Sequence, residues 1–173
     1  VDGLTAHPAA EGLGGAVGCY AEYIVLDNQL AQPKPREIGF VAAAAAPLVL
    51  ITAWESLHDR ARISAGQTVL IHGGAGGVGH VAIQLARLAG ARVAATVSSP
   101  ETADYVHTLG AECAINYRDE DLRDAIADWT GGRGVDVALA PVKERQVRAH
   151  GKAAVDHRAK PEYRLLSVAE ILG

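Results

Sequence analysis

Hydrophobic and polar positions follow two different periods over the middle of the chain. Short apolar runs without charged residues at their centres, over 68–71, 92–97, 113–116 and 135–139, indicate strands buried in a sheet. Apolar positions three or four residues apart predict helices over 78–89, 100–109 and 119–130, between those runs. This alternation predicts an α/β fold built on a doubly wound parallel sheet.

The segments that flank this pattern are less regular. Residues 1–18 are predicted as loop, 19–26 as a strand and 28–36 as a connection that contains two prolines. Two helices are expected over 38–46 and 48–61, separated by Pro47, with Leu50, Trp54 and Leu57 on one face of the second. The uncharged run 38–54 is short and interrupted, so it favours a buried helix pair over a membrane span. Past residue 141 a short strand at 152–155 and a helical turn at 167–172 are the only elements expected.

A glycine-rich turn joins the first of these strands to the first of these helices. Gly74, Gly76 and Gly79 match the spacing G-x-G-x-x-G, with Gly77 and Val78 inside the same turn. The first glycine would permit a tight turn, the second a close approach of backbone to a pyrophosphate, and the third close packing of helix on strand. The helix that follows offers free N–H groups and a positive dipole end to phosphate. The sequence therefore predicts a Rossmann-type dinucleotide site, with a purely structural glycine turn as the alternative.

The composition of the chain limits the classes of binding partner and the compartment that we expect. The formal net charge of −4 gives no support for a nucleic-acid or membrane-surface partner. Cys19 and Cys113 fit no metal or redox spacing, and each is expected to be a small buried side chain. A soluble protein of a reducing, cytoplasmic compartment is expected. The sequence contains no methionine, which favours an incomplete chain.

Ordered motifs carry a resemblance to a known family. They are AEYIV at 21–25, ITAWESL at 51–57, GQTVLIHGGAGGVGHVAIQLARLAGARV at 66–93, LGAECAINYRDED at 109–121 and GGRGVDVAL at 131–139. Together they resemble the medium-chain dehydrogenase/reductase superfamily, in its zinc-free quinone oxidoreductase (zeta-crystallin-like) branch. The resemblance implies a remnant of a GroES-like β domain over 1–36, which is the catalytic domain of the family, and a dinucleotide-binding domain over 37–173.

The resemblance also implies positions for the cofactor. Thr52 matches a threonine near the nicotinamide, with a buried helix threonine as the equally weighted alternative. Tyr117 and Arg118 match neighbours of the adenosine phosphate. Ser98 and Ser99, about twenty residues past Gly79, carry no charge to repel a 2′-phosphate and can donate hydrogen bonds to it, although Ser99 also suits a helix N-cap.

We therefore expect NADPH rather than NADH, with two departures that weaken the expectation. Related NADPH-using proteins often carry a lysine where this chain has Thr102, and Glu101 adds a carboxylate nearby.

The expected reaction is NADPH-dependent hydride transfer to a quinone or an α,β-unsaturated carbonyl, a small-molecule electron acceptor. No catalytic residue is assigned. No metal is expected, because Leu48 stands where zinc-dependent relatives place a cysteine ligand. A dinucleotide-binding module without turnover is one alternative, and an assembly role, such as a homodimer formed through sheet edges, is another.

Overall fold

The computed structural model describes residues 22–23, 25, 32–140 and 164–167. Residue contacts divide the chain into two compact units, Val1–Val49 and Leu50–Gly173. The second unit holds the sheet and the glycine turn, so it contains the features on which function depends.

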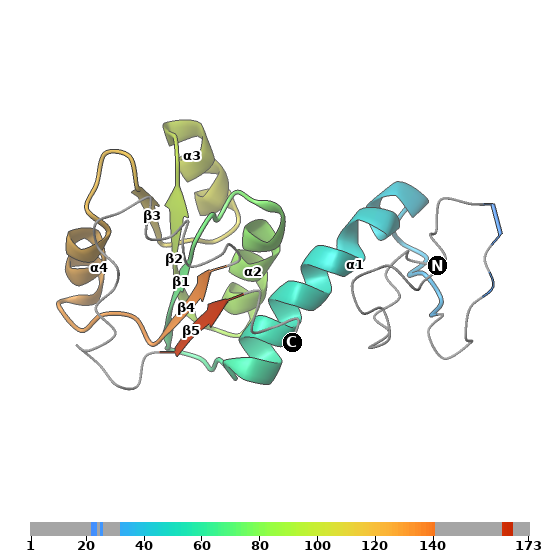
Figure 1. The fold of residues 1–173 in the computed structure, drawn as a ribbon, viewed down its shortest axis with the longest axis horizontal. Coiled ribbons are helices and arrows are strands. Elements are labelled where there is room, and N and C mark those ends of the chain that lie inside the picture. Colours follow the sequence, from blue (N-terminus) through green and yellow to red (C-terminus); the bar gives the residue numbers. More distant parts are fainter. Residues whose placement is uncertain (1–21, 24, 26–31, 141–163, 168–173) are drawn as a thin grey trace. The chain divides into compact units, whose positions relative to one another are not determined.

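A parallel sheet forms the centre of the second unit (Figure 1). Its strands have the order β3-β2-β1-β4-β5, and every neighbouring pair is parallel. The strands are β1 (Thr68–Ile71), β2 (Arg92–Val97), β3 (Cys113–Asn116), β4 (Val137–Ala140) and β5 (Arg164–Ser167). The order reverses between β1 and β4, which is the topological switch point of this type of sheet.

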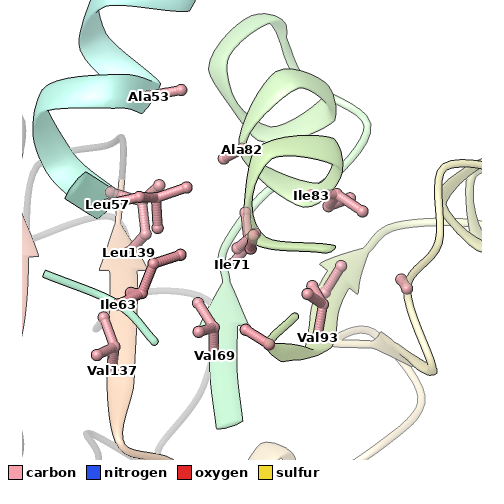
Figure 2. Packing of buried hydrophobic residues seen from close by; sticks show 14 of the residues in the cluster. Ala53, Leu57, Ile63, Val69, Ile71, Ala82, Ile83, Val93, Val137 and Leu139 are labelled. Carbon is pink, nitrogen blue, oxygen red and sulfur yellow. The ribbon is translucent and has the colours of Figure 1, made fainter. Parts of the chain in front are cut away.

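Helices cover both faces of the sheet, as the alternation of elements predicted. One face packs on α2 (Gly77–Leu88) and α3 (Pro100–Thr108), and its buried residues include Val69, Ile71 and Ile83 (Figure 2). The other face packs on α4 (Leu122–Thr130) through Leu70 and Ala138. The predicted doubly wound α/β fold is therefore confirmed.

The predicted pair of helices around Pro47 is wrong. A single helix α1 (Phe40–Trp54) runs through Pro47 and continues as the π-helical turn η3 (Glu55–Arg60). Proline removes only its own N–H from the helix ladder, and the run of alanines before it has the highest helix propensity. Phe40–Arg60 is 21 residues long and contains an 18-residue window with a mean hydropathy of 1.7, so its length and composition alone would also suit a membrane span.

The end of this helix belongs to the core of the second unit. Ala53 and Leu57 are fully buried in the cluster that also contains Ala82 of α2 (Figure 2). Leu50 and Trp54 remain half-exposed, so of the three residues predicted to share a face only Leu57 is buried in the core.

Two further boundaries differ from expectation. Helix α4 begins at Leu122 with Asp121 as its N-cap, not at Asp119. Ser167 ends strand β5, where the sequence suggested the start of a helical turn. Most of the predicted strand over 19–26, all of that over 152–155 and residues 168–172 lie outside the described residues.

A hydrogen-bonded clamp fixes β4 beside β1 at the end of the sheet remote from the glycine turn. One carboxylate oxygen of Asp136 accepts from the backbone N–H of Thr68 at 2.7 Å and from its hydroxyl at 2.8 Å. The backbone N–H of Asp136 in turn donates to the carbonyl oxygen of Thr68 at 2.9 Å. Thr68 is fully buried, so its N–H has no access to water as a substitute partner.

Asp136→Ala is therefore expected to lower the free energy of unfolding by about 2 kcal/mol, because it leaves a buried N–H unpaired and removes a charge-assisted bond. Urea denaturation followed by circular dichroism measures the change. Asp104→Ala removes an exposed aspartate of α3 and serves as the matched control, with an expected change within about 0.5 kcal/mol. Equal stability of the two variants would contradict the role of the clamp.

Candidate functional site

The glycine turn leaves the carboxyl end of β1 and is fastened to the strands on both sides. His72 donates its backbone N–H to the carbonyl oxygen of Leu139 in β4 at 2.9 Å. On the other side Thr96 of β2 accepts twice, through its hydroxyl from Gly73 N–H and through its carbonyl from Gly74 N–H, both at 2.9 Å. These hydrogen bonds hold the turn rigidly against the sheet. Helix α2 then runs away from the carboxyl end of β1.

Each glycine of the turn has a distinct steric role. The left-handed backbone conformation belongs to Gly73, at φ +65°, which the motif did not single out, rather than to Gly74. A Cβ on Gly74 would lie 2.7 Å from the Cβ of Ala95, so this glycine permits close packing of the turn on β2. A Cβ on Gly79 would lie 2.2 Å from the carbonyl oxygen of Gly73, so this glycine lets α2 start directly against the turn.

The amino terminus of α2 suits an anion. Gly76 is its N-cap, in an extended conformation, and no acidic residue lies in the first turn. The N–H groups of Gly77, Val78 and Gly79 precede the first intrahelical hydrogen bonds, so they are available to a ligand, and the helix dipole favours negative charge. A Cβ on Gly76 would lie 3.1 Å from the Gly73 carbonyl oxygen, a tight contact, so glycine keeps the space at the start of α2 open.

The residues predicted to surround the adenosine phosphate follow the two neighbouring strands. Val97 of β2 pairs with Asn116 of β3, and Tyr117 donates its backbone N–H to the Val97 carbonyl oxygen at 3.2 Å. Ser98 and Tyr117 are therefore the first residues beyond the ends of adjacent strands. The fold brings these segments together at the same edge as the glycine turn.

Ser99 is the N-cap of α3, which confirms the helix start that the sequence indicated. Its hydroxyl accepts from the N–H of Thr102, whose own hydroxyl accepts from the N–H of Ser99 at 3.1 Å. The single hydroxyl proton of Ser99 is donated to the Glu101 carboxylate, so Ser99 would donate to a ligand only in exchange for that bond. Thr102 stabilises the helix start and adds no positive charge.

The loop after β3 exposes a cation. Asn116 occupies both neighbouring carboxylates, since its N–H donates to Glu120 at 2.8 Å and its side-chain amide donates to Asp119 at 2.5 Å. The side chain of Arg118 is exposed and forms no ion pair within the described part of the chain. The two acids are thereby held within the loop, and the arginine remains available to an anionic ligand.

One acidic residue, Glu101, lies near the same predicted phosphate-binding region as Arg118. Glu101, in the first turn of α3, is fully exposed, and a hydrogen bond from the Ser99 side chain is the main cause that lowers the pKa of its carboxyl group. Its position, 22 residues past Gly79, is near that of the acid that binds the ribose 2′-OH in NAD-binding proteins. This region therefore contains one group that would attract a 2′-phosphate and one that would repel it.

Thr52 and His72 are buried rather than open to the edge. Thr52 is 5% exposed, and its carbonyl oxygen accepts from the hydroxyl of Ser56 one turn later in the helix. The assignment of Thr52 to the nicotinamide stays a prediction. His72 is 7% exposed, and burial lowers its pKa to about 4. Sequence analysis did not identify Thr96 or His72, because a single threonine or histidine at a strand end carries no pattern.

The burial of Cys113 also differs, to a smaller extent, from what the sequence predicted. The sequence suggested a buried cysteine, whereas the thiol at the start of β3 is half-buried, with its pKa raised by burial and then by Glu120. No group of three His, Cys, Asp or Glu side chains that could hold a metal ion is found among the residues that the structure describes.

Comparison with known proteins agrees with this geometry. The family described as zinc-binding dehydrogenase matches residues 77–156. The enoyl reductase CurK superposes with a TM-score of 0.65 at 31% identity, over 79% of this chain and 47% of that one. Escherichia coli quinone oxidoreductase, solved in complex with NADPH, gives a TM-score of 0.62 at 36% identity, over 66% and 35%. This chain belongs to the medium-chain dehydrogenase/reductase superfamily.

Within this superfamily the chain is also similar to parts of very large enzymes. It is 41% identical over 142 residues to the phthioceranic/hydroxyphthioceranic acid synthase of Mycobacterium tuberculosis, which covers 81% of this chain but 7% of the synthase. The chain thus spans a small part of that relative and less than half of each solved structure compared above. Similarity thus extends to proteins described as an enoyl reductase and a quinone oxidoreductase and to part of a synthase, and the part shared with the solved structures is the Rossmann-type fold.

Proposed function

We propose that this chain binds NADPH and takes part in hydride transfer to a small-molecule acceptor, a quinone or an α,β-unsaturated carbonyl compound. The observation that carries the proposal is the convergence of three features at one edge of the sheet. They are the glycine turn with the open start of α2, the pair Ser98–Ser99, and the exposed Arg118. Ligands of open α/β sheets bind at this carboxyl edge.

The residues present fit a dinucleotide. The pyrophosphate would lie over Gly76 against the N–H groups of the first turn of α2, where no side chain or acidic group obstructs it. The adenosine half would extend toward the ends of β2 and β3, where Ser98, Ser99, Tyr117 and Arg118 lie. The bound nicotinamide would supply the hydride, and the chain would supply orientation and electrostatics.

The comparisons support this proposal at a coarser level. The Escherichia coli protein was solved with NADPH, and CurK is described as an enoyl reductase. The reduction of an activated double bond is common to quinone and enone acceptors, which is why both substrate classes are retained. A soluble, cytoplasmic protein that also forms a homodimer is part of the same proposal.

A dinucleotide-binding module without turnover is the alternative, supported by the short span of the chain relative to its relatives. The two are separated by mixing the chain with NADPH and either 1,4-benzoquinone or an enone and following absorbance loss of the reduced nicotinamide. Saturable turnover supports the enzyme, whereas binding without turnover supports the module.

The cofactor assignment is tested by titration of NADPH and of NADH, with quenching of tryptophan fluorescence as the signal. Arg118→Ala is expected to weaken NADPH binding about tenfold and to change NADH binding by less than twofold, because only NADPH carries the 2′-phosphate. Arg123→Ala removes an exposed arginine of α4 and is the matched control, expected to leave both affinities unchanged.

Glu101→Gln removes a negative charge from the same predicted phosphate-binding region, whereas Arg118→Ala removes a positive one. Removing its negative charge should strengthen NADPH binding, and removing a carboxylate acceptor for ribose hydroxyls should weaken NADH binding. Tighter binding of NADH than of NADPH by the unaltered chain, with no response to Arg118→Ala, would contradict the NADPH assignment.

A further inference from the structure

His72 lies at the point where the strand order reverses. It follows Ile71 at the carboxyl end of β1, and its backbone N–H reaches across to Leu139 of β4. On one side the order continues through β2 and β3, and on the other through β4 and β5. A dinucleotide bound across such a sheet places its two halves on opposite sides of this point.

The imidazole of His72 is a buried polar group with an unused hydrogen-bonding atom. The residue is more than nine-tenths buried, and its Nε2 atom has no hydrogen-bond partner within the described part of the chain. Buried polar atoms are nearly always paired in folded proteins, so an exception beside a candidate ligand site requires a reason. No described hydrogen bond has to be broken for the ring to rotate about its two side-chain bonds.

The chemistry of the ring restricts what it could bind. Burial keeps the imidazole neutral near pH 7, so it offers one N–H donor and one nitrogen acceptor rather than a positive charge. Neutral groups that both donate and accept, such as ribose hydroxyls and a carboxamide, are the matching partners. The pyrophosphate, by contrast, has its own donors at the start of α2.

We propose that His72 is a positioning residue whose imidazole forms a hydrogen bond with the nicotinamide riboside half of a bound dinucleotide. This inference rests on the proposed dinucleotide binding and assigns a contact on the β4 side of the glycine turn. The adenosine half lies on the β2 side, beyond the reach of this ring. His72 therefore distinguishes a whole dinucleotide from its adenosine half.

The test compares NADPH with 2′,5′-ADP, which carries the 2′-phosphate and adenosine but lacks the nicotinamide riboside. His72→Leu replaces the ring with an apolar side chain of similar size, and His72→Gln keeps a neutral donor and acceptor. His72→Leu should weaken NADPH binding about tenfold and leave 2′,5′-ADP binding within twofold, and His72→Gln should recover part of the loss. The unchanged affinity for 2′,5′-ADP doubles as proof that the variant is folded.

Two results would overturn the inference. If both ligands weaken together in His72→Leu and in His72→Gln, the ring supports the glycine turn and contacts no ligand. If neither affinity changes, the ring has no part in binding. Failure of the unaltered chain to bind either ligand would instead remove the proposed function itself, and with it this inference, so the two failures are distinguishable.

Discussion

Gly79→Ala is expected to lower the free energy of unfolding by about 3 kcal/mol and to abolish dinucleotide binding. The added Cβ would lie 2.2 Å from the carbonyl oxygen of Gly73 and 2.9 Å from that of Gly74. Both are backbone atoms of a turn that is bonded to β2 and β4, so neither can move without breaking those bonds. Overpacking against backbone costs more than overpacking against a flexible side chain.

The same substitution at Gly39 is the control for the general effect of replacing glycine by alanine. No atom lies within 4 Å of a Cβ built on Gly39, and its backbone is not left-handed. Gly39→Ala should therefore change the stability by less than about 0.5 kcal/mol. Denaturation with urea and titration with NADPH measure the two effects. Wild-type stability and affinity in Gly79→Ala would show that the turn can relax, contrary to its close contacts with two strands.

The second large expected effect is a loss of folding stability at acidic pH. Burial lowers the pKa of His72 to about 4 in the folded chain, from an ordinary value of 6.5, because it removes water from around the charged imidazole. The unfolded chain therefore binds a proton between pH 6.5 and 4 that the folded chain does not bind. Stability is fully retained above pH 6.5 and falls as the pH decreases through this window. The shift converts to a loss of about 3 kcal/mol, which levels off below pH 4.

Comparison of variants isolates this contribution from those of other titrating groups. His72→Leu removes the titration, so the difference in unfolding free energy between variant and wild type should move in favour of the variant as the pH is lowered from 7 to 4.5. Urea denaturation at both pH values gives that difference. His107→Gln, which removes an exposed histidine, is the matched control for the replacement of a histidine. A difference between His72→Leu and wild type that is constant with pH would contradict the assignment.

Local signals in the sequence were sufficient where the physics is local. Ser99 followed by Pro100 predicted the start of α3, and the structure shows the hydroxyl cap. Gly90 directly follows the first predicted helix, where a glycine commonly adopts the left-handed conformation, and it has φ +78°. Both outcomes depend on atoms within a few residues, so composition and spacing predict them.

Other predictions failed where a single local hydrogen bond, the tolerance of a helix for one proline, or pairing with a distant strand decided the outcome. Asp119 has the composition of a helix start, but its carboxylate bonds to Asn116 in the preceding turn, and Asp121 caps α4 instead. Pro47 signalled a helix boundary, yet the helix continues through it. Strand β5 was not expected, because two leucines between Arg164 and Ser167 form too short an apolar pattern to predict a strand before a neighbouring strand pairs with it.

The sequence by itself determined the alternation of strands and helices, the glycine turn between the first of them, and hence the fold and the edge at which a ligand would bind. Only the tertiary structure decided which side chains face that edge with unused bonding capacity. Arg118 is available because Asn116 bonds to both neighbouring carboxylates. His72, whose backbone N–H bonds to Leu139 of β4, has a buried side-chain nitrogen without a partner among the described residues. Strand and helix periods are encoded in nearest neighbours, whereas burial and pairing depend on segments more than sixty residues apart.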